Sequence, residues 1–358
     1  MESLSIAVLP GDGIGVEVTH SALKVLDRLG SRAGLRFVPQ HLRAGAIAYQ
    51  ETGTALSDET IRSAGEADAM LLGAMGLPHI RYADGTEIAP QLDLREHFGL
   101  FAGVRPIRPL PGLPSKLADS RAADIDFVMV REQTEGLFKE RGATLMKGDD
   151  EARDAMVITR AGVQRVSDFA LNLGRQRKAR GRPGRVTCVD KANVLGSMAY
   201  FRRIFEERAA AFPDVTADSA YVDAMALNLV MKPWDYDVMV TENLLGDILS
   251  DLGAALVGGM GMAPSGDIGE SHALFQPAHG SAPDIAGRGI ANPTAMLLSV
   301  VLMLDWLALR HSEAPLEEAA RALERAINQA YAEKRILPFE FGGRSNTADI
   351  TAAVLAAL

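Results

Sequence analysis

The sequence lacks the features that mark secreted, membrane-spanning or nucleic-acid-binding proteins. One cysteine, Cys188, among 358 residues excludes an internal disulfide framework and fits a reducing cytosol, where we expect a buried structural thiol. The 37 lysines and arginines are outnumbered by 46 aspartates and glutamates, so no basic surplus exists to hold nucleic-acid phosphates. No signal-peptide pattern opens the chain, and its most apolar segment, 292–309, contains Asp305 and falls short of the ~20 residues of a membrane span. We therefore expect a cytoplasmic protein with no nucleic-acid or membrane partner.

Short apolar or β-branched runs alternate with helical patterns along the chain. This alternation indicates α/β architecture with a mainly parallel sheet. No repeat of fixed period and no low-complexity linker is present, so we expect any second domain to form where the chain crosses out and back. The expected strands are 5–9, 69–72, 127–130, 185–189 and 238–240, and the expected helices are 16–29, 58–65, 159–176, 198–211, 244–256 and 315–333.

The stretch Ile6–Val18, IAVLPGDGIGVEV, joins a strand pattern to a helix pattern through three alternate glycines. A glycine-rich turn between a strand and a helix often holds the phosphates of a dinucleotide. The spacing here is GxGxG rather than GxGxxG, and the region about 20 residues beyond the helix start, where the fingerprint requires a carboxylate, offers Gln40 and His41. We therefore predict a tight strand-to-helix turn and not a Rossmann site.

Two carboxylates, Asp247 and Asp251, lie four residues apart in a predicted helix and so share one face of it. The residues around them are mainly apolar, which predicts a mostly buried helix whose carboxylates require a cation. Oxygen ligands favour Mg²⁺ or Mn²⁺ over zinc. Asp223 offers a third carboxylate, although the same spacing is also common on solvated helix faces.

Basic residues and glycines follow several predicted strands, where ligands bind in parallel α/β sheets. The forked guanidinium of arginine matches the geometry of a carboxylate, so a set of arginines in an acidic chain predicts a substrate with more than one carboxylate. The residues just past apolar runs carry glycine, charge or amide and are Gly11, Gly73–Gly76, Arg131, Lys191 and Glu242–Asn243. The basic set is Arg95, Arg105, Arg108 and Arg131, with Lys191.

The segment His279–Pro293, HGSAPDIAGRGIANP, is rich in small residues. Its carboxylate, Asp284, is suited to a ribose diol and would repel a 2′-phosphate. We expect Asn292 to cap the long apolar helix, with Pro293 in the first helical position. An ordinary helix-capping loop is the alternative interpretation.

Seven motifs occur in order along nearly the whole chain: GDGIG, LR…VRP, VREQTEG, VDKANVL, YVDAMA, GDILSDL and HGSAPDIAGRGIANP. Together they resemble the β-decarboxylating dehydrogenases, the isocitrate/isopropylmalate dehydrogenase family, and within it the 3-isopropylmalate, tartrate and D-malate enzymes most. The resemblance implies two α/β domains that share a central, mainly parallel sheet, not of Rossmann type. A large cofactor-side domain would comprise 1–103 and 256–358, and a small domain, 104–255, would hold the substrate, the metal and the dimer interface. Residues 142–160 would form a protruding hairpin arm.

The resemblance also implies an activity, namely NAD-dependent, Mg²⁺- or Mn²⁺-dependent oxidative decarboxylation of a 3-substituted D-malate. The first guess is conversion of 3-isopropylmalate to 4-methyl-2-oxopentanoate, in leucine biosynthesis, by a homodimer with shared active sites. The substrate carboxylates would be bound by Arg95, Arg105 and Arg131. The metal would be held by Asp247 and Asp251 of one subunit together with Asp223 of the partner subunit. Lys191 of the partner subunit would be the general base. The cofactor residues would be Ile14, Ala74, Gly76, Asn193, His279, Gly280, Ser281, Ala282, Asp284, Ile285 and Asn292.

Three residues bear on how far this resemblance extends. Phe138 stands where the family has a tyrosine thought to protonate the enol carbon, so the proton would come from water, from Lys139 or from Tyr82, or decarboxylation would be incomplete. Gln91 and Leu92 stand where isopropylmalate enzymes have two leucines around the isopropyl group, and a buried amide favours a polar substituent. Tartrate or D-malate is therefore the alternative substrate, followed by isocitrate, and a non-catalytic paralogue is the alternative from another class.

Overall fold

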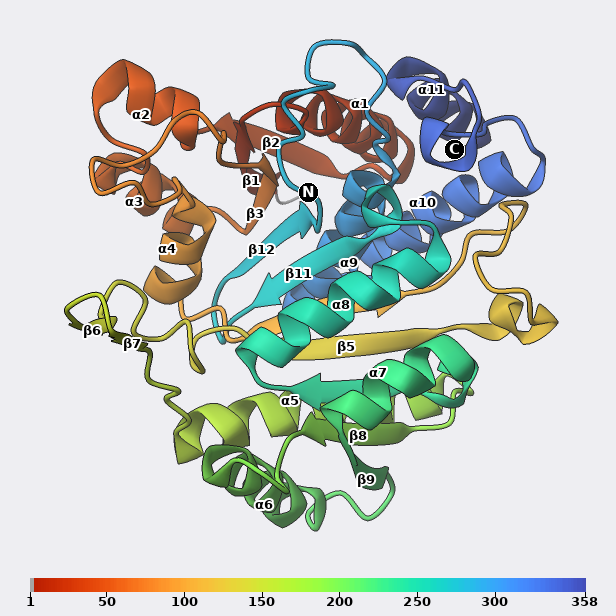
Figure 1. Cartoon of the computed structure of the whole chain (residues 1–358). Coiled ribbons are helices and arrows are strands. Elements are labelled where there is room, and N and C mark those ends of the chain that lie inside the picture. The colour runs from red at the N-terminus through yellow and green to blue at the C-terminus, as the bar shows by residue number, and fades with distance from the viewer. Residues whose placement is uncertain (1–2) are drawn as a thin grey trace. The chain divides into compact units, whose positions relative to one another are not determined.

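The computed structural model describes residues 3–358, which divide into two compact units. Unit 1 contains the chain up to Phe98 together with Leu110–Pro114 and Gly258–Leu358, and unit 2 contains Gly99–Pro109 and Ser115–Val257. Helices and strands alternate in both units (Figure 1). The predicted α/β fold with a large, mainly parallel sheet is confirmed.

Five strands of unit 1 lie in the order β2-β1-β3-β12-β11. All neighbours pair in parallel except β11 and β12. The central strand β3 is buried along its whole length, as its apolar sequence requires. The bounds are β1 Ser3–Gly11, β2 Arg36–His41, β3 Ala69–Ala74, β11 Pro264–Ile268 and β12 Ala273–Pro277.

The helices of unit 1 include one long apolar helix, α9 (Thr294–His311). By length and composition alone α9 would be able to cross a membrane, but it packs on β11, β12 and α10 as a core helix. The other helices are α1 Gly15–Ala33, α2 Ala46–Thr52, α3 Asp58–Glu66, α4 Pro90–His97, α10 Ala314–Ala332 and α11 Thr347–Ala357, with short 3₁₀ turns at Met260–Met262 (η3) and Phe339–Phe341 (η4).

The start of α9 corrects one prediction. Pro293 occupies the cap position and the helix begins at Thr294, so Asn292 is not the cap residue. Pro293 has no N–H, so the first backbone N–H at this end of the helix is that of Thr294. The Asn292 Oδ1 accepts it at 3.0 Å, so the side chain still contributes to the helix terminus.

Five strands of unit 2 lie in the order β4-β5-β10-β8-β9, and only β4 and β5 pair antiparallel. Helices α7 and α8 lie in front of these strands in Figure 1, whereas α5 and α6 pack together behind them. The bounds are β4 Ala102–Ile107, β5 Phe127–Glu132, β8 Arg185–Asp190, β9 Thr216–Tyr221, β10 Val238–Thr241, α5 Arg160–Ala179, α6 Gly196–Ala209, α7 Val222–Met231 and α8 Asn243–Val257, with 3₁₀ turns at Ser120–Asp124 (η1) and Pro233–Asp235 (η2).

Two further predictions for unit 2 are met by the structure. Cys188 is fully buried in β8, and burial raises the pKa of its thiol well above the usual value, as expected of a structural cysteine. Residues 142–160 contain an antiparallel hairpin, β6 (Leu145–Lys147) with β7 (Glu151–Arg153). Leu145 and Met146 on this hairpin are 71% and 65% exposed.

Candidate active site

The glycine-rich turn after β1 brings three backbone segments of unit 1 into direct contact. Gly11 has φ +70°, and a Cβ there would lie 1.9 Å from the carbonyl oxygen of Ala74. A Cβ on Gly13, with φ +55°, would lie 2.0 Å from the carbonyl oxygen of Ser281. The Ile14 N–H donates to that same Ser281 oxygen at 2.8 Å. The glycines are therefore required by close backbone packing, which brings Ile14, Ala74 and Ser281 together.

The loop that begins at His279 contains an unused acceptor. The ring of His279 is largely buried, which lowers its pKa because burial disfavours the imidazolium. With Nδ1 bonded to the Gly280 oxygen at 2.9 Å, the Nε2 atom is buried without a hydrogen-bond partner. Asp284 is exposed farther along the loop. This segment therefore offers a neutral imidazole acceptor and a solvated carboxylate.

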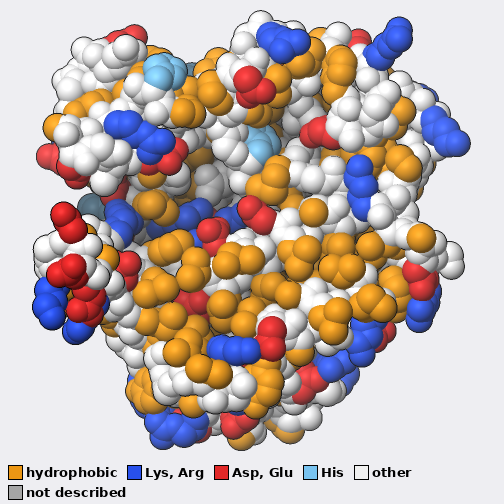
Figure 2. Space-filling view, in the orientation of Figure 1, with side chains coloured by type: hydrophobic (Ala, Val, Ile, Leu, Met, Phe, Trp, Pro, Cys, Tyr) orange, Lys and Arg blue, Asp and Glu red, His pale blue; other side chains and the backbone are white. Residues whose placement is uncertain are grey.

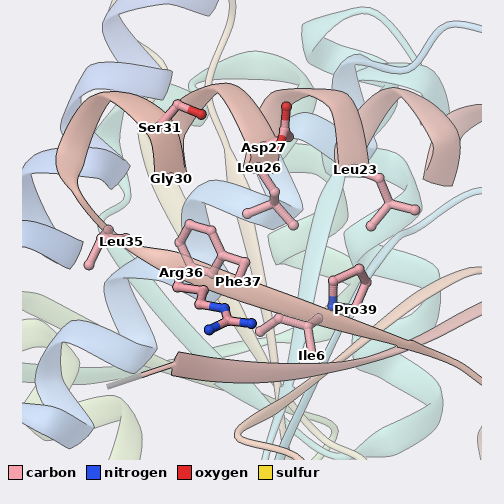
Figure 3. Close-up of a pocket in the computed structure, with 10 residues that line it drawn as sticks. All are labelled: Ile6, Leu23, Leu26, Asp27, Gly30, Ser31, Leu35, Arg36, Phe37 and Pro39. Atoms are coloured by element: carbon pink, nitrogen blue, oxygen red, sulfur yellow. The ribbon is translucent and has the colours of Figure 1, made fainter. Parts of the chain in front are cut away.

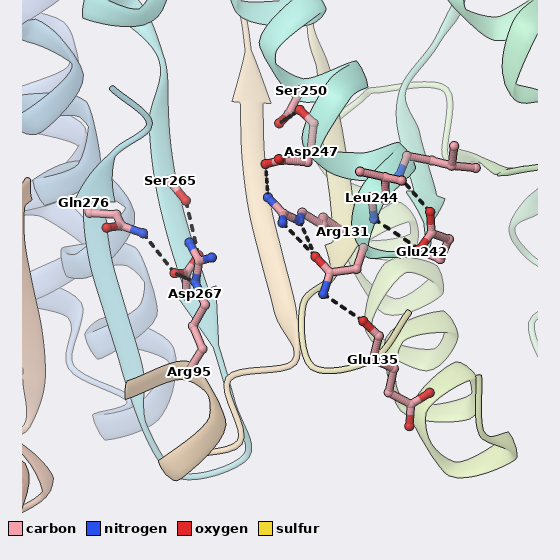
Figure 4. A network of polar contacts seen from close by, with 12 residues as sticks. Arg95, Arg131, Glu135, Glu242, Leu244, Asp247, Ser250, Ser265, Asp267 and Gln276 are labelled. Carbon is pink, nitrogen blue, oxygen red and sulfur yellow. Dashed lines mark hydrogen bonds and ion pairs between the residues drawn. The ribbon is translucent and has the colours of Figure 1, made fainter. Parts of the chain in front are cut away.

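Arg95 is held by a buried carboxylate that sequence reasoning missed (Figure 4). Its Nε donates to Asp267 Oδ2 at 2.7 Å, and the side chains of Arg95 and Asp267 are 9% and 0% exposed. Gln276 Nε2 donates to the same oxygen at 3.0 Å, and Ser265 Oγ donates to the other at 3.3 Å. Asp267 thus fixes the position of the guanidinium within unit 1.

Gln91 lies in the first turn of α4, four residues before Arg95. Its Oε1 atom is buried and has no hydrogen-bond partner, which is costly unless a ligand supplies a donor. Leu92 beside it is partly buried.

Arg131 lies at the end of β5 in unit 2 and is 3% exposed. Its Nε and Nη2 donate to Asn243 Oδ1 at 2.9 and 2.7 Å, and its Nη1 forms an ion pair with Asp247 (Figure 4). Gly246 allows the arginine stem to pack on α8, since a Cβ there would lie 2.7 Å from Arg131 Cγ. The ring of Phe138 covers the guanidinium, with its centroid 5.6 Å from Cζ.

Helix α8 is mainly buried, as expected, and its two aspartates lie on the more exposed side. The side chain of Asp247 is 49% exposed, and Ile248 is 59% exposed. The buried face combines apolar side chains such as Leu249 and Leu256 with small residues such as Gly246, and it packs on β5. Burial, and then the charge of Asp247, raise the pKa of Asp251, and Arg105 and Arg131 only partly offset this.

Lys191 and Asp223 form a pair at the ends of β8 and β9. Lys191 Nζ lies 2.6 Å from Asp223 Oδ1, and this bond lowers the pKa of the carboxyl. The side chain of Asp223 is 67% exposed. Across residues 3–358 of the single chain, no three histidines, cysteines or acidic residues are grouped to hold a metal, so Asp223 does not join Asp247 and Asp251. Asn193 is exposed just beyond Lys191.

A pocket of about 280 Å³ lies elsewhere in unit 1, between α1 and β2 (Figure 3). Apolar side chains such as Leu26 and Phe37 line it together with the charged Asp27 and Arg36. None of the predicted site residues lines this pocket.

Comparison with known proteins places the chain among enzymes. The profile of the isocitrate/isopropylmalate dehydrogenase family matches residues 5–354. The 3-isopropylmalate/3-methylmalate dehydrogenase of Methanocaldococcus jannaschii is 42% identical over 98% of this chain and 97% of its own. The 3-isopropylmalate dehydrogenase of Methanothermobacter thermautotrophicus is 41% identical over 99% and 98%. The crystal structure of isocitrate dehydrogenase from Methylococcus capsulatus has a TM-score of 0.87 at 35% identity and covers 99% of both chains.

The fold, the buried arginines and these matches define a decarboxylating dehydrogenase, an oxidoreductase. The chain belongs to the isocitrate/isopropylmalate dehydrogenase family. The family and the enzyme class predicted from the sequence are confirmed.

Proposed function

We propose that the protein catalyses the NAD-dependent, Mg²⁺- or Mn²⁺-dependent oxidative decarboxylation of a 3-substituted D-malate. Relatives about 40% identical over nearly the full chain are named for 3-isopropylmalate, which is therefore the first substrate proposed. The observation that carries the proposal is the position of buried Arg131 beside Asp247. A fixed guanidinium suits a substrate carboxylate, and the adjacent carboxylate suits a metal.

The acidic residues fit a divalent cation. Burial and then the charge of Asp247 raise the pKa of Asp251, a cation would relieve the repulsion between the two carboxylates, and all the donors are oxygens. The third ligand would be Asp223 of the partner subunit, whose exposure leaves it accessible to a second copy. A bound Mg²⁺ or Mn²⁺ supplies Lewis-acid stabilisation of the charge that develops at the substrate oxygens.

The pair of Lys191 with Asp223 places the proposed general base beside a proposed metal ligand. Lys191 Nζ donates to Asp223 Oδ1 at 2.6 Å. In the assembled site Lys191 of the partner subunit would take the proton of the substrate hydroxyl as the general base. Arg95, Arg105 and Arg131 would meanwhile orient the carboxylates of the substrate.

The loop at His279 fits the adenosine half of NAD. The unpartnered His279 Nε2 and the backbone of Gly280–Ala282 offer hydrogen-bonding groups, and Asp284 is an exposed acceptor for a ribose diol. A carboxylate there repels a 2′-phosphate, which favours NAD over NADP. Ile14, Ala74, Gly76, Asn193, Ile285 and Asn292 complete the proposed contacts.

An apolar surface on unit 2 supports the homodimer part of the proposal. Figure 2 shows hydrophobic side chains gathered over α7 and α8. Leu227, Met231 and Ile248 there are 63%, 64% and 59% exposed, which is unusual for three large apolar side chains on one face. The β6–β7 hairpin would add a second contact, and the assembly would be cytoplasmic.

A polar C3 substituent, as in tartrate, or the unsubstituted D-malate is the second candidate, because Gln91 Oε1 is buried without a donor. Initial rates of cofactor reduction with Mn²⁺ separate the candidates. The panel comprises 3-isopropylmalate, D-malate, L- and meso-tartrate, isocitrate and homoisocitrate, each with NAD and with NADP. We expect 3-isopropylmalate with NAD to give the highest kcat/KM. Higher kcat/KM with tartrate or D-malate would transfer the proposal to that substrate, and preference for NADP would contradict the role of Asp284.

A further inference from the structure

Asp12, within the GDGIG turn, is a carboxylate that the proposed reaction does not use. It is 1% exposed. Its Oδ2 accepts the N–H groups of Ala46 at 2.7 Å and Gly76 at 2.8 Å, and its Oδ1 accepts that of Ile47 at 2.9 Å. One buried carboxylate thus joins the start of α2 to the loop after β3. Hydrogen bonds from several backbone donors are what makes a buried charge tolerable.

The surroundings of Asp12 are shaped for this contact. The cap residue of α2 is Gly45, which has no side chain, so Asp12 supplies the capping oxygens from another segment. A Cβ on Gly45, with φ +110°, would lie 2.5 Å from Asp12 Oδ2. Any other residue at position 45 would displace the carboxylate.

Gly76 is held from both sides. Asp12 accepts its N–H, and its carbonyl oxygen accepts the hydroxyl of Ser281. The carbonyl oxygen of Ser281 in turn accepts the N–H of Ile14, two residues after Asp12. The turn, the Gly76 loop and the Ser281 loop therefore form a closed ring of hydrogen bonds within unit 1.

We propose that Asp12 is the positioning residue of the NAD site: its carboxylate sets the Gly76 loop in register with the Ser281 loop. This inference rests on the proposed function, which assigns both loops to NAD. The glycines of the GDGIG turn let the backbones meet, and the aspartate between them fixes the loop that the cofactor contacts. No contact between Asp12 and the cofactor is required.

The test is Asp12→Asn in the full-length protein. The asparagine side chain replaces one carboxylate oxygen with an NH₂ group, which is a donor. At least one of the three backbone N–H groups that Asp12 accepts would therefore face another donor and lose its hydrogen bond. We expect the Kd for NAD, measured by calorimetry with Mn²⁺ present, to rise about tenfold, which corresponds to 1.4 kcal/mol. Hydrogen exchange of a peptide containing Gly76 should accelerate without ligand, and the KM for the malate substrate at saturating NAD should stay within about twofold, since Arg131 and Arg105 are untouched.

The matched control is Asp68→Asn. Asp68 also accepts a backbone N–H and a hydroxyl, both from Ser5, at 2.7 and 2.9 Å, but it lies before β3 rather than after it. We expect this variant to lose stability while it keeps the wild-type Kd for NAD. An equal rise in Kd in both variants would reduce Asp12 to a general structural role and overturn the proposal.

Ser281→Ala removes the hydroxyl that donates to the Gly76 carbonyl oxygen, in the same ring of hydrogen bonds. This variant tests the positioning of the Gly76 loop if Asp12→Asn does not fold. It should also weaken NAD binding, and an unchanged Kd would overturn the proposal. A wild-type protein that binds no NAD would instead contradict the proposed function. Wild-type binding together with normal binding by Asp12→Asn contradicts the positioning role alone.

Discussion

The Arg131 guanidinium and the Asp247 carboxylate are each other's charge partner at the end of β5. In the proposed reaction the arginine binds substrate and the aspartate binds metal, so in the free chain each group occupies the other's ligand position. Bound substrate and metal would each replace one partner of this ion pair. This ion pair explains how a 3% exposed arginine can remain stable without substrate.

The first prediction concerns the pH dependence of stability. Because the pKa of Asp251 is raised, its carboxyl binds a proton more readily in the folded chain than in the unfolded chain. Its ionised form therefore disfavours folding at neutral pH, and this effect disappears as the pH falls through the raised pKa. In metal-free urea unfolding, Asp251→Asn should be more stable than wild type at pH 7, with the difference closing toward pH 4.

Asp119 provides a control, because its pKa is shifted in the opposite direction from that of Asp251. Hydrogen bonds from Arg121 lower its pKa to about 2, so its ionised form favours folding throughout this pH range. Asp119→Asn should be no more stable than wild type at either pH. A difference for Asp251→Asn that did not change with pH would contradict the assignment.

The second prediction concerns the shared active site. Lys191→Met removes the proposed base and Asp251→Asn removes a metal ligand, so each variant alone should be almost inactive. In a mixed dimer both defects fall in one site and the other site is intact, so random reassociation should recover roughly a quarter of wild-type activity. No recovery after denaturation and refolding of the mixture would show that each site is built from one chain.

The third prediction concerns Phe138. Phe138→Tyr places a phenol beside Arg131 at the position of the stacked ring. A positioned general acid typically contributes about 10² or more in rate, so we expect turnover to rise between about tenfold and a hundredfold if protonation limits it. The ratio of CO₂ released to NADH formed should also move toward one. Unchanged turnover and product ratio would show that another donor already serves the wild-type enzyme, and Phe138→Leu controls for loss of stacking.

The fourth prediction concerns Asp267. Asp267→Ala leaves the buried Arg95 without its partner, which should lower the free energy of unfolding by about 3–5 kcal/mol and raise the KM for substrate. Asp214→Ala breaks an exposed pair with Arg175 of similar geometry, at 2.7 Å, and should change neither quantity appreciably. Chemical denaturation and steady-state kinetics provide both measurements.

The sequence predicted those elements whose own composition determines them. Strands β1, β3, β5, β8 and β10 are apolar and largely buried, and each was expected within three residues of its bounds. Strand β9, TADSAY, is half exposed and polar, and β11, PSGDI, begins with proline and contains glycine. These two strands form because neighbouring strands offer hydrogen-bond partners, and the local sequence pattern does not show such partners.

The site shows the same limit. Arg131, Asp247 and Asp251 follow recognisable patterns, but their supports are distant in the chain. Asp267 is 172 residues from the arginine that it holds. The sequence predicted a mainly buried α8 and left open whether Asp247 and Asp251 lie on a solvated face, because that depends on how the helix packs against strands distant in the chain, such as β5.

The contact between the turn at Gly11–Gly15 and the loops at Ala74 and Ser281 has a consequence for engineering. A Cβ at Gly11 or Gly13 would lie within about 2 Å of a carbonyl oxygen in another loop, a separation no relaxation of side chains can relieve. In the proposed NAD site, a Ser281 loop transplanted from an NADP-using relative would therefore need the matching turn and the matching Gly76 segment from the same donor. The three segments would have to be exchanged together, although some 270 positions separate Gly11 from Ser281 in the sequence.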